Sequence, residues 1–182
     1  MITYDKAIEL VRPYRWDIDG RKRYDVLRGV TKALSTDETR WVLQYIKVDK
    51  ETIVATDGRR VHLCDNLLEL PEGLWKPVIN RVKNMVLLPC MDETAKYPNY
   101  KQVIPVMHGY DKITEHEDLT YVLGHLGKAD CFASLEYMRD ATDKKTSCPD
   151  GYSVHVNDEL SPIVVLGQAC GYKGIVMPLR RT

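Results

Sequence analysis

The stretch of sequence that decides the fold is Val54-Ala55-Thr56-Asp57-Gly58-Arg59-Arg60-Val61. Asp57-Gly58 is a turn dipeptide, because Gly adopts positive φ without steric cost and Asp can bond the backbone just downstream. β-branched and aromatic residues are enriched in the flanking residues 41–48 and 62–64, which favours strands on both sides. The sequence therefore predicts a β-hairpin with a polar turn.

Three other blocks accompany this turn along the chain: LSTDETR at residues 34–40, YPNYKQVIP at residues 97–105 and GIVMPLR at residues 174–180. Together with the turn, they resemble the bacterial DNA polymerase III beta sliding clamp family. In that family an Ala-Thr-Asp-Gly-His-Arg turn follows an Asp-Glu-Thr-Arg-like segment, and Phe-Pro-Asp-Tyr and Val-Met-Pro-Met-Arg segments come later. Four blocks in family order are far more specific than one short motif.

The resemblance implies an α+β DNA-clamp (processivity) fold, with helices packed on antiparallel sheets. The full beta clamp has three domains, whereas 182 residues leave room for one large or two small domains. We therefore expect a single compact clamp-like unit over residues 1–182, made of two halves at about 1–105 and 106–182, or two shortened clamp domains. Pro, Gly and acidic residues between 105 and 118 indicate the boundary.

Apolar residues three or four apart predict an amphipathic helix over residues 21–34, and shorter helices are expected at 4–14 and 131–141. Strands are predicted at 41–48, within 76–88, and at 119–123, 152–156, 162–166 and 174–177. Each half thus contains a helix together with strands. This arrangement resembles the paired helix-and-sheet repeat within one clamp domain.

The composition favours neither nucleic acid nor membranes, because 26 basic residues balance 26 acidic ones. A ring around DNA needs only a locally basic inner face. The N-terminus lacks the apolar region of a signal peptide, and no apolar run approaches the roughly 20 residues that span a bilayer. We therefore expect a cytoplasmic protein with no membrane partner, and the resemblance implies that it is nucleoid-associated.

Catalytic and metal-binding motifs are not found in the sequence. The cysteines are scattered without paired spacing, which predicts reduced thiols and neither a disulfide framework nor a zinc site: Cys64, Cys90, Cys131, Cys148 and Cys170. Phosphate-loop, serine-hydrolase and zinc-protease motifs are lacking. His62 and Cys64 share one strand face but lack a third group to orient the base. We therefore expect no enzyme, no metal and no cofactor. The alternative to this expectation is a small cytosolic enzyme that uses Cys64.

The resemblance implies a peptide-binding pocket, which in beta clamps receives short linear motifs from DNA polymerases, the clamp loader and repair proteins. Apolar residues would form a floor for Leu or Phe anchors, Met177 would adapt its shape, and Arg60 and Arg180 would form the rim. Arg59 departs from the family, which commonly has His. The structural alternative is an ordinary hairpin and core strand. The matching positions are Leu43, Thr56, Gly58, Arg59, Arg60, Val61, Pro98, Val103, Ile175, Met177, Pro178, Leu179 and Arg180.

Three basic residues share one flank of the helix predicted at 21–34, namely Arg21, Arg28 and Lys32. Asp25 projects from the same side, so a solvated helix face is the alternative. The resemblance implies that this flank contacts the backbone of double-stranded DNA without sequence preference. Clamp rings are closed by six domains, so we expect a homo-oligomer of three or six copies. The competing prediction is a monomeric, clamp-derived peptide-binding module that does not encircle DNA.

Overall fold

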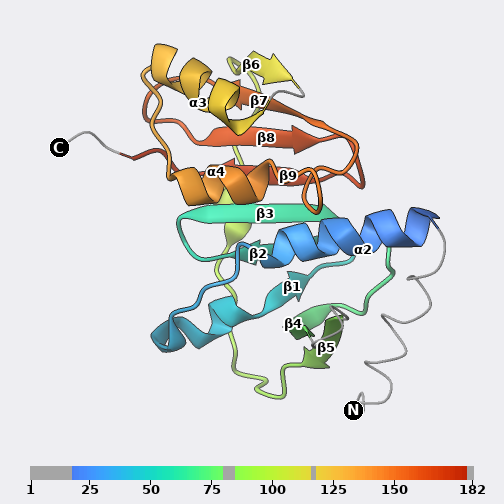
Figure 1. Cartoon of the computed structure of the whole chain (residues 1–182). Helices are drawn as coiled ribbons and strands as arrows, with labels where there is room; N and C mark the ends of the chain where they lie inside the picture. The colour runs from blue at the N-terminus through green and yellow to red at the C-terminus, as the bar shows by residue number, and fades with distance from the viewer. Residues whose placement is uncertain (1–17, 80–84, 116–117, 180–182) are drawn as a thin grey trace.

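The computed structural model describes residues 18–79, 85–115 and 118–179. In this part of the chain, nine antiparallel strands form one sheet in the order β5-β4-β1-β2-β3-β9-β8-β7-β6 (Figure 1). Before residue 105 come β1 (Ile46–Val48), β2 (Thr52–Thr56), β3 (Arg60–Asp65), β4 (Gly73–Ile79) and β5 (Met85–Pro89). After it come β6 (Asp111–Glu115), β7 (Tyr152–Val156), β8 (Ile163–Gly167) and β9 (Lys173–Val176). Pairing of β3 with β9 joins the two halves into one sheet.

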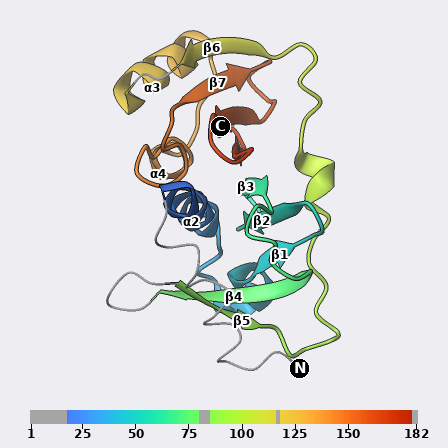
Figure 2. The ribbon, with the colours of Figure 1, turned by 90° about the vertical axis from the view of Figure 1, so that its right-hand side faces the viewer.

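The three α-helices of the described residues cover one face of the sheet (Figure 2). Helix α2 (Ile18–Thr31) packs on β2 and β3, α4 (Leu135–Ala141) packs on β9, and α3 (Leu119–Lys128) packs on β6. The segment between β5 and β6 crosses the opposite face and contains the short 3-10 helix η3 (Tyr100–Val103). The two faces are therefore covered by different kinds of structure.

The two faces have separate apolar cores. Strand β2 supplies Ile53 and Ala55 to the main core beneath the helices, while Val54 belongs to a smaller cluster on the other face. This alternation follows from the two-residue period of a strand. The smaller cluster is closed by Tyr97 and Ile104 of the crossing segment, and its buried members are Val54, Val61, Leu63, Tyr100 and Ile175.

Helix α2 approaches the second half of the chain closely at Gly29. A Cβ atom at this position would lie 2.5 Å from Ser147 Cα, a distance that side-chain carbons do not tolerate. The loop after α4 can therefore lie directly against the helix backbone only because residue 29 is glycine.

The α+β class expected from the sequence is confirmed, and two helices occur where the periodicity predicts them. Helix α2 matches the prediction at 21–34 and α4 the prediction at 131–141, with shifted ends. The predicted hairpin around Asp57-Gly58 is also confirmed as β2 and β3. The helix predicted at 4–14 lies outside the described residues.

One strand prediction is confirmed only in part, and another is wrong. Only β1 forms within the strand predicted at 41–48, because Asp37 caps a 3-10 helix, η2 (Glu38–Gln44), by accepting a hydrogen bond from the Thr39 N–H. Residues 119–123 belong to α3 instead of a strand. Here Asp118 caps the helix through the Tyr121 N–H at 2.9 Å, and Val122 and Leu126, four residues apart, bury one helical face.

Candidate peptide-binding pocket

The turn between β2 and β3 is held by its own side chains. Asp57 Oδ1 accepts hydrogen bonds from the backbone N–H groups of Arg59 at 2.8 Å and Arg60 at 3.1 Å. Thr56 Oγ1 donates to the Arg60 carbonyl at 2.7 Å and accepts from the Gly58 N–H at 3.0 Å. Gly58 has a φ of 89°, in the region that favours glycine. The Thr-Asp-Gly sequence therefore fixes the turn locally.

A cavity of about 240 Å³ lies beside this turn, where η3 crosses the sheet. Its floor includes Val61 and Ile175, which are direct partners in the β3–β9 ladder. Four segments of the chain surround this floor: η2, the β2–β3 turn, the crossing segment and the end of β9. The lining residues are Arg40, Thr56, Gly58, Arg59, Arg60, Val61, Pro98, Asn99, Tyr100, Val103, Ile175 and Met177.

Most of the residues proposed from the sequence are brought together in this cavity. They are Thr56, Gly58, Arg59, Arg60, Val61, Pro98, Val103, Ile175 and Met177. Arg40, Asn99 and Tyr100 also line it but were not assigned to the site, although each belongs to a block that carries the family resemblance.

Four proposed residues are not among those that line the cavity: Leu43, Pro178, Leu179 and Arg180. Leu43 is buried in η2, not in a strand as expected, and only 4% of it is exposed. The Leu179 N–H donates to the Phe132 carbonyl at 2.6 Å, where the chain passes α4 after Met177 and Pro178. Leu179 is exposed. Arg180 lies outside the described residues.

Tyr100 holds the crossing segment against the sheet. Its hydroxyl donates to Asp49 Oδ2 at 2.6 Å, and its ring belongs to the smaller apolar cluster. Burial and the hydrogen bond to Asp49 raise the pKa of Tyr100 well above its ordinary value. The hydroxyl is therefore protonated at neutral pH and can act as the donor, so this wall of the cavity is anchored by both polar and apolar contacts.

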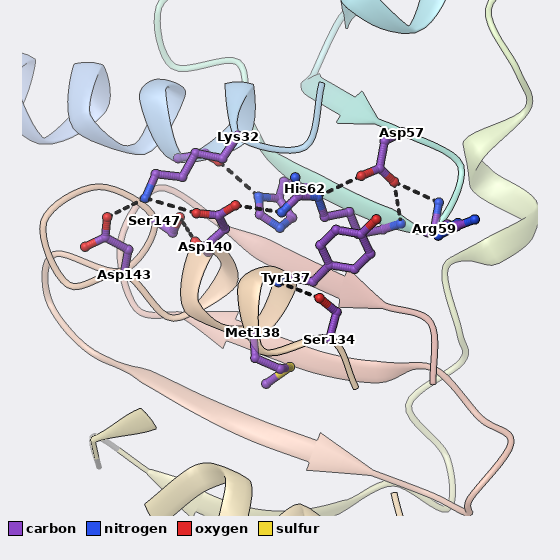
Figure 3. A network of polar contacts seen from close by, with 12 residues as sticks. Lys32, Asp57, Arg59, His62, Ser134, Tyr137, Met138, Asp140, Asp143 and Ser147 are labelled. Atoms are coloured by element: carbon purple, nitrogen blue, oxygen red, sulfur yellow. Dashed lines mark hydrogen bonds and ion pairs between the residues drawn. The ribbon is translucent and has the colours of Figure 1, made fainter. Parts of the chain in front are cut away.

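Arg60 is only 7% exposed and connects the turn to helix α4. Figure 3 shows its partners, Asp57 of the turn and Asp140 and Tyr137 of helix α4. Arg60 Nε lies 3.0 Å from Asp57 Oδ2, and its Nη1 lies 2.7 Å from Asp140 Oδ2. The guanidinium also lies 4.3 Å from the centre of the Tyr137 ring. Arg60 therefore lines the cavity while its charge is satisfied by two carboxylates.

His62 lies beneath this network and is fully buried. Its Nδ1 is 3.0 Å from the Gly29 carbonyl, so Nδ1 carries the proton and donates. Burial lowers the pKa of His62 to about 4, which keeps the imidazole neutral at pH 7. Burial also raises the pKa of the Cys64 thiol far above its ordinary value. Because a thiolate is not populated at Cys64, this pair lacks the activated nucleophile that the enzymatic alternative requires.

On the flank of α2 proposed to contact DNA, the described basic side chains lie beside carboxylates. Arg28 Nη1 lies 3.9 Å from Asp25 Oδ1. Lys32 Nζ donates to Asp143 Oδ2 and lies 3.6 Å from Asp140 Oδ1. The side chain of Arg21 lies outside the described residues. The two described cations are therefore paired with carboxylates of the same chain.

The described part of the chain offers neither a metal-binding cluster nor a membrane-spanning helix. No group of three or more His, Cys, Asp or Glu side chains there could hold a metal ion. Its helices are also too short or too polar to cross a membrane. The five cysteines, all of which are described, are free thiols.

The sequence matches no protein-family model and no curated protein. Solved structures nevertheless resemble this fold. The beta subunit of DNA polymerase III from Thermotoga maritima has a TM-score of 0.62 at 15% identity, covering 91% of this chain and 65% of that chain. The beta sliding clamp of C. crescentus has a TM-score of 0.56 at 16% identity, covering 90% and 64%. The sliding clamp of Bacillus subtilis has a TM-score of 0.53 at 15% identity, covering 87% and 62%.

These matches span less than two thirds of the solved clamps but nearly all of this chain. The expectation drawn from the four sequence blocks is therefore confirmed at the level of the fold. The chain has the fold of the bacterial DNA polymerase III beta subunit, the DNA sliding clamp, over a shorter length.

Proposed function

We propose that this chain is a clamp-like, non-catalytic accessory factor that binds linear peptide motifs of DNA polymerases, clamp loaders or repair proteins. The cavity beside the β2–β3 turn is the observation that carries this proposal. It gathers residues from both halves of the chain around the apolar pair Val61 and Ile175. Its volume of about 240 Å³ is below the roughly 300–1,000 Å³ of small-molecule sites, which suits apolar side chains of a peptide.

The exposed apolar side chains at the cavity support a docking role. Val103 and Met177, which line the cavity, are 40% and 39% exposed, so their apolar surfaces are accessible to a ligand. Met adapts its shape to different apolar partners, which suits a site for several motifs. A buried apolar centre with a polar edge is also the usual arrangement of peptide hot spots.

Fluorescence polarisation with a labelled peptide ending in Leu-Phe would test this proposal. We expect Val103→Asp and Met177→Asp each to weaken binding about tenfold or more, because a carboxylate would occupy the apolar floor or wall. Val106→Asp is the matched control, since Val106 lies on the same segment, is 82% exposed and does not line the cavity. If Val103→Asp and Met177→Asp bind the peptide as tightly as Val106→Asp and the wild type do, the cavity is not the peptide site.

The larger proposal is that several copies form a ring that encircles double-stranded DNA as a processivity factor. Strands β5 and β6 are the two edges of the described sheet, and edge strands can pair with another copy. Light scattering over a range of concentrations and salt would test assembly. A stable trimer or hexamer would support a closed ring.

The second candidate is a monomeric peptide-binding module that does not encircle DNA. One observation favours it: the cavity is lined by both halves of a single chain and needs no second copy. A monomer that persists at high concentration would support this candidate. Loss of salt-sensitive DNA association on changing Arg21, Arg28 and Lys32 together to Glu would instead support the ring, provided circular dichroism shows the variant folded.

A further inference from the structure

Strands β5 and β6 lie at opposite edges of the described sheet and differ in their chemistry (Figure 1). The edge strand β6 carries charged side chains at three of its five positions, namely Asp111, Lys112 and Glu115. Its pairing with β7 also shifts register between Lys112 and Thr114. Natural sheets use charges and bulges of this kind to prevent an edge strand from pairing with another chain. The β6 edge is therefore protected.

The β5 edge has neither protection. Its sequence, MVLLP, contains no charged residue, and its pairing with β4 continues without a shift along the whole strand. Met85 and Leu87 are buried in the main core, so Val86 and Leu88 point to the opposite face of the sheet. Both are only half-buried there, and Val78, the direct partner of Val86 on β4, is 42% exposed. An uncharged edge strand beside exposed apolar side chains favours pairing with another strand.

The backbone of β5 presents hydrogen-bonding groups at this edge. The Cys90 N–H donates to the Leu74 carbonyl at 2.8 Å, so residue 90 directs its backbone groups toward β4. This direction alternates from residue to residue in an antiparallel pair, so Met85, Leu87 and Pro89 direct theirs away from β4. Proline has no N–H. The outward donors are therefore the N–H groups of Met85 and Leu87, and the outward acceptors are the carbonyls of all three residues.

We propose that two copies of this chain form a symmetric dimer by pairing their β5 strands antiparallel, around a two-fold axis at Leu87. In this register Leu87 lies opposite Leu87 of the second copy, and the two residues exchange N–H···O=C bonds. The Met85 N–H donates to the Pro89 carbonyl of the second copy, and the missing N–H of Pro89 ends the ladder on each side. Val86 lies opposite Leu88 of the second copy, so apolar side chains meet across the contact. One sheet then continues through both copies.

A second β5 suits this edge better than β6 of another copy does. Pairing β5 with β6 would place charged side chains beside apolar ones and would have to accommodate the register shift of β6. Pairing β5 with itself brings no charge into the contact. A two-fold contact closes on itself, so any larger assembly built on it contains an even number of copies. The contact is independent of peptide binding, since no residue of β5 lines the cavity.

Two double variants of β5 with opposite charges would test this contact by light scattering. Val86→Lys with Leu88→Lys places Lys opposite Lys in the two-fold register, and Val86→Glu with Leu88→Glu places Glu opposite Glu. We expect a wild-type dimer and monomers of each variant over about 1–500 µM protein. An equimolar mixture of the two variants should restore the dimer at low salt and lose it at high salt, because each Lys then faces a Glu. Asp111→Lys, an exposed position on β6, is the matched control and should leave the wild-type dimer intact.

Four results would overturn the two-fold contact. A wild type that stays monomeric at about 500 µM would show that β5 does not pair with a second copy, as when another segment of the same chain covers it. A trimer, or dissociation by Asp111→Lys as strong as that by the β5 variants, would indicate head-to-tail pairing of β5 with β6. Dimers that persist in both β5 variants would place the contact elsewhere. A mixture that stays monomeric, although circular dichroism shows both variants folded, would exclude the pairing of Val86 with Leu88.

Discussion

Arg60 Nη1 lies 2.7 Å from Asp140 Oδ2, so an ion pair joins the turn of the first half to helix α4 of the second. The residues are 80 positions apart in the chain. The same guanidinium binds Asp57, whose other oxygen holds the turn. The wall of the cavity and the packing of α4 on the sheet therefore depend on one buried cation.

Asp140→Asn should lower the free energy of unfolding by about 2–3 kcal/mol, because it leaves Arg60 buried with a weaker partner. The expected loss is smaller than for a fully buried pair, since 21% of the Asp140 side chain is exposed. Urea unfolding at pH 7 would measure it. Lys112→Gln, which breaks the exposed Lys112–Glu115 pair, should cost less than about 1 kcal/mol. Equal losses in the two variants would contradict a structural role for the Arg60–Asp140 pair.

His62 should make the protein less stable in acid. Its pKa is about 4 in the folded protein and about 6.5 when unfolded, so the unfolded chain binds the proton first as pH falls. Its contribution is fully present above pH 6.5 and is lost between about 6.5 and 4. A shift of this size corresponds to roughly 3 kcal/mol.

Urea unfolding at a series of pH values, compared with His62→Gln, would measure this contribution. The carboxylates are common to both proteins, so the difference between the two pH curves should have its slope between pH 6.5 and 4. The NMR signals of the His62 imidazole should titrate near pH 4 in the folded protein. A titration near 6.5 would show that His62 is not buried as described.

The sequence predicted best what neighbouring residues determine. The β2–β3 turn forms through hydrogen bonds of Thr56 and Asp57 to residues within four positions, so its motif is sufficient to predict it. Long-range pairing was not accessible in this way. Lys32 was proposed to contact DNA, but it binds Asp143, 111 residues away, and no periodicity on α2 indicates that partner.

The errors have similar causes. Residues 119–123 combine apolar and aromatic residues as a strand does, and the single cap at Asp118 favours the helix instead. The pocket residues were proposed one by one from the family resemblance. Those from the turn, the crossing segment and the end of β9 do line one cavity. The sequence does not identify Arg40 as a pocket residue, because its place at the rim depends on η2, a 3-10 helix that also takes up the first residues of the strand predicted at 41–48.

Two glycines in helices should respond oppositely to the same substitution. Gly29→Ala should destabilise the protein by about 1–3 kcal/mol, because the added Cβ would lie 2.5 Å from Ser147 Cα. Gly124→Ala should stabilise it by about 0.5–1 kcal/mol, since its Cβ would meet nothing within 4 Å and alanine favours the helix. Thermal unfolding would measure both. Stabilisation by Gly29→Ala would contradict the close packing of α2 against the loop after α4.

Tyr100→Phe should loosen the wall of the cavity without emptying the smaller apolar cluster. The variant loses the hydrogen bond to Asp49 at 2.6 Å but keeps the ring, so we expect a loss of about 1–2 kcal/mol in unfolding free energy. Hydrogen exchange should increase locally at residues 97–104, where the crossing segment lies on the sheet. Tyr121→Phe is the control, because Tyr121 lies on α3, is 48% exposed and does not line the cavity. If exchange at residues 97–104 is the same in both variants, the Tyr100–Asp49 bond does not hold the segment in place, and the wall of the cavity depends on apolar packing alone.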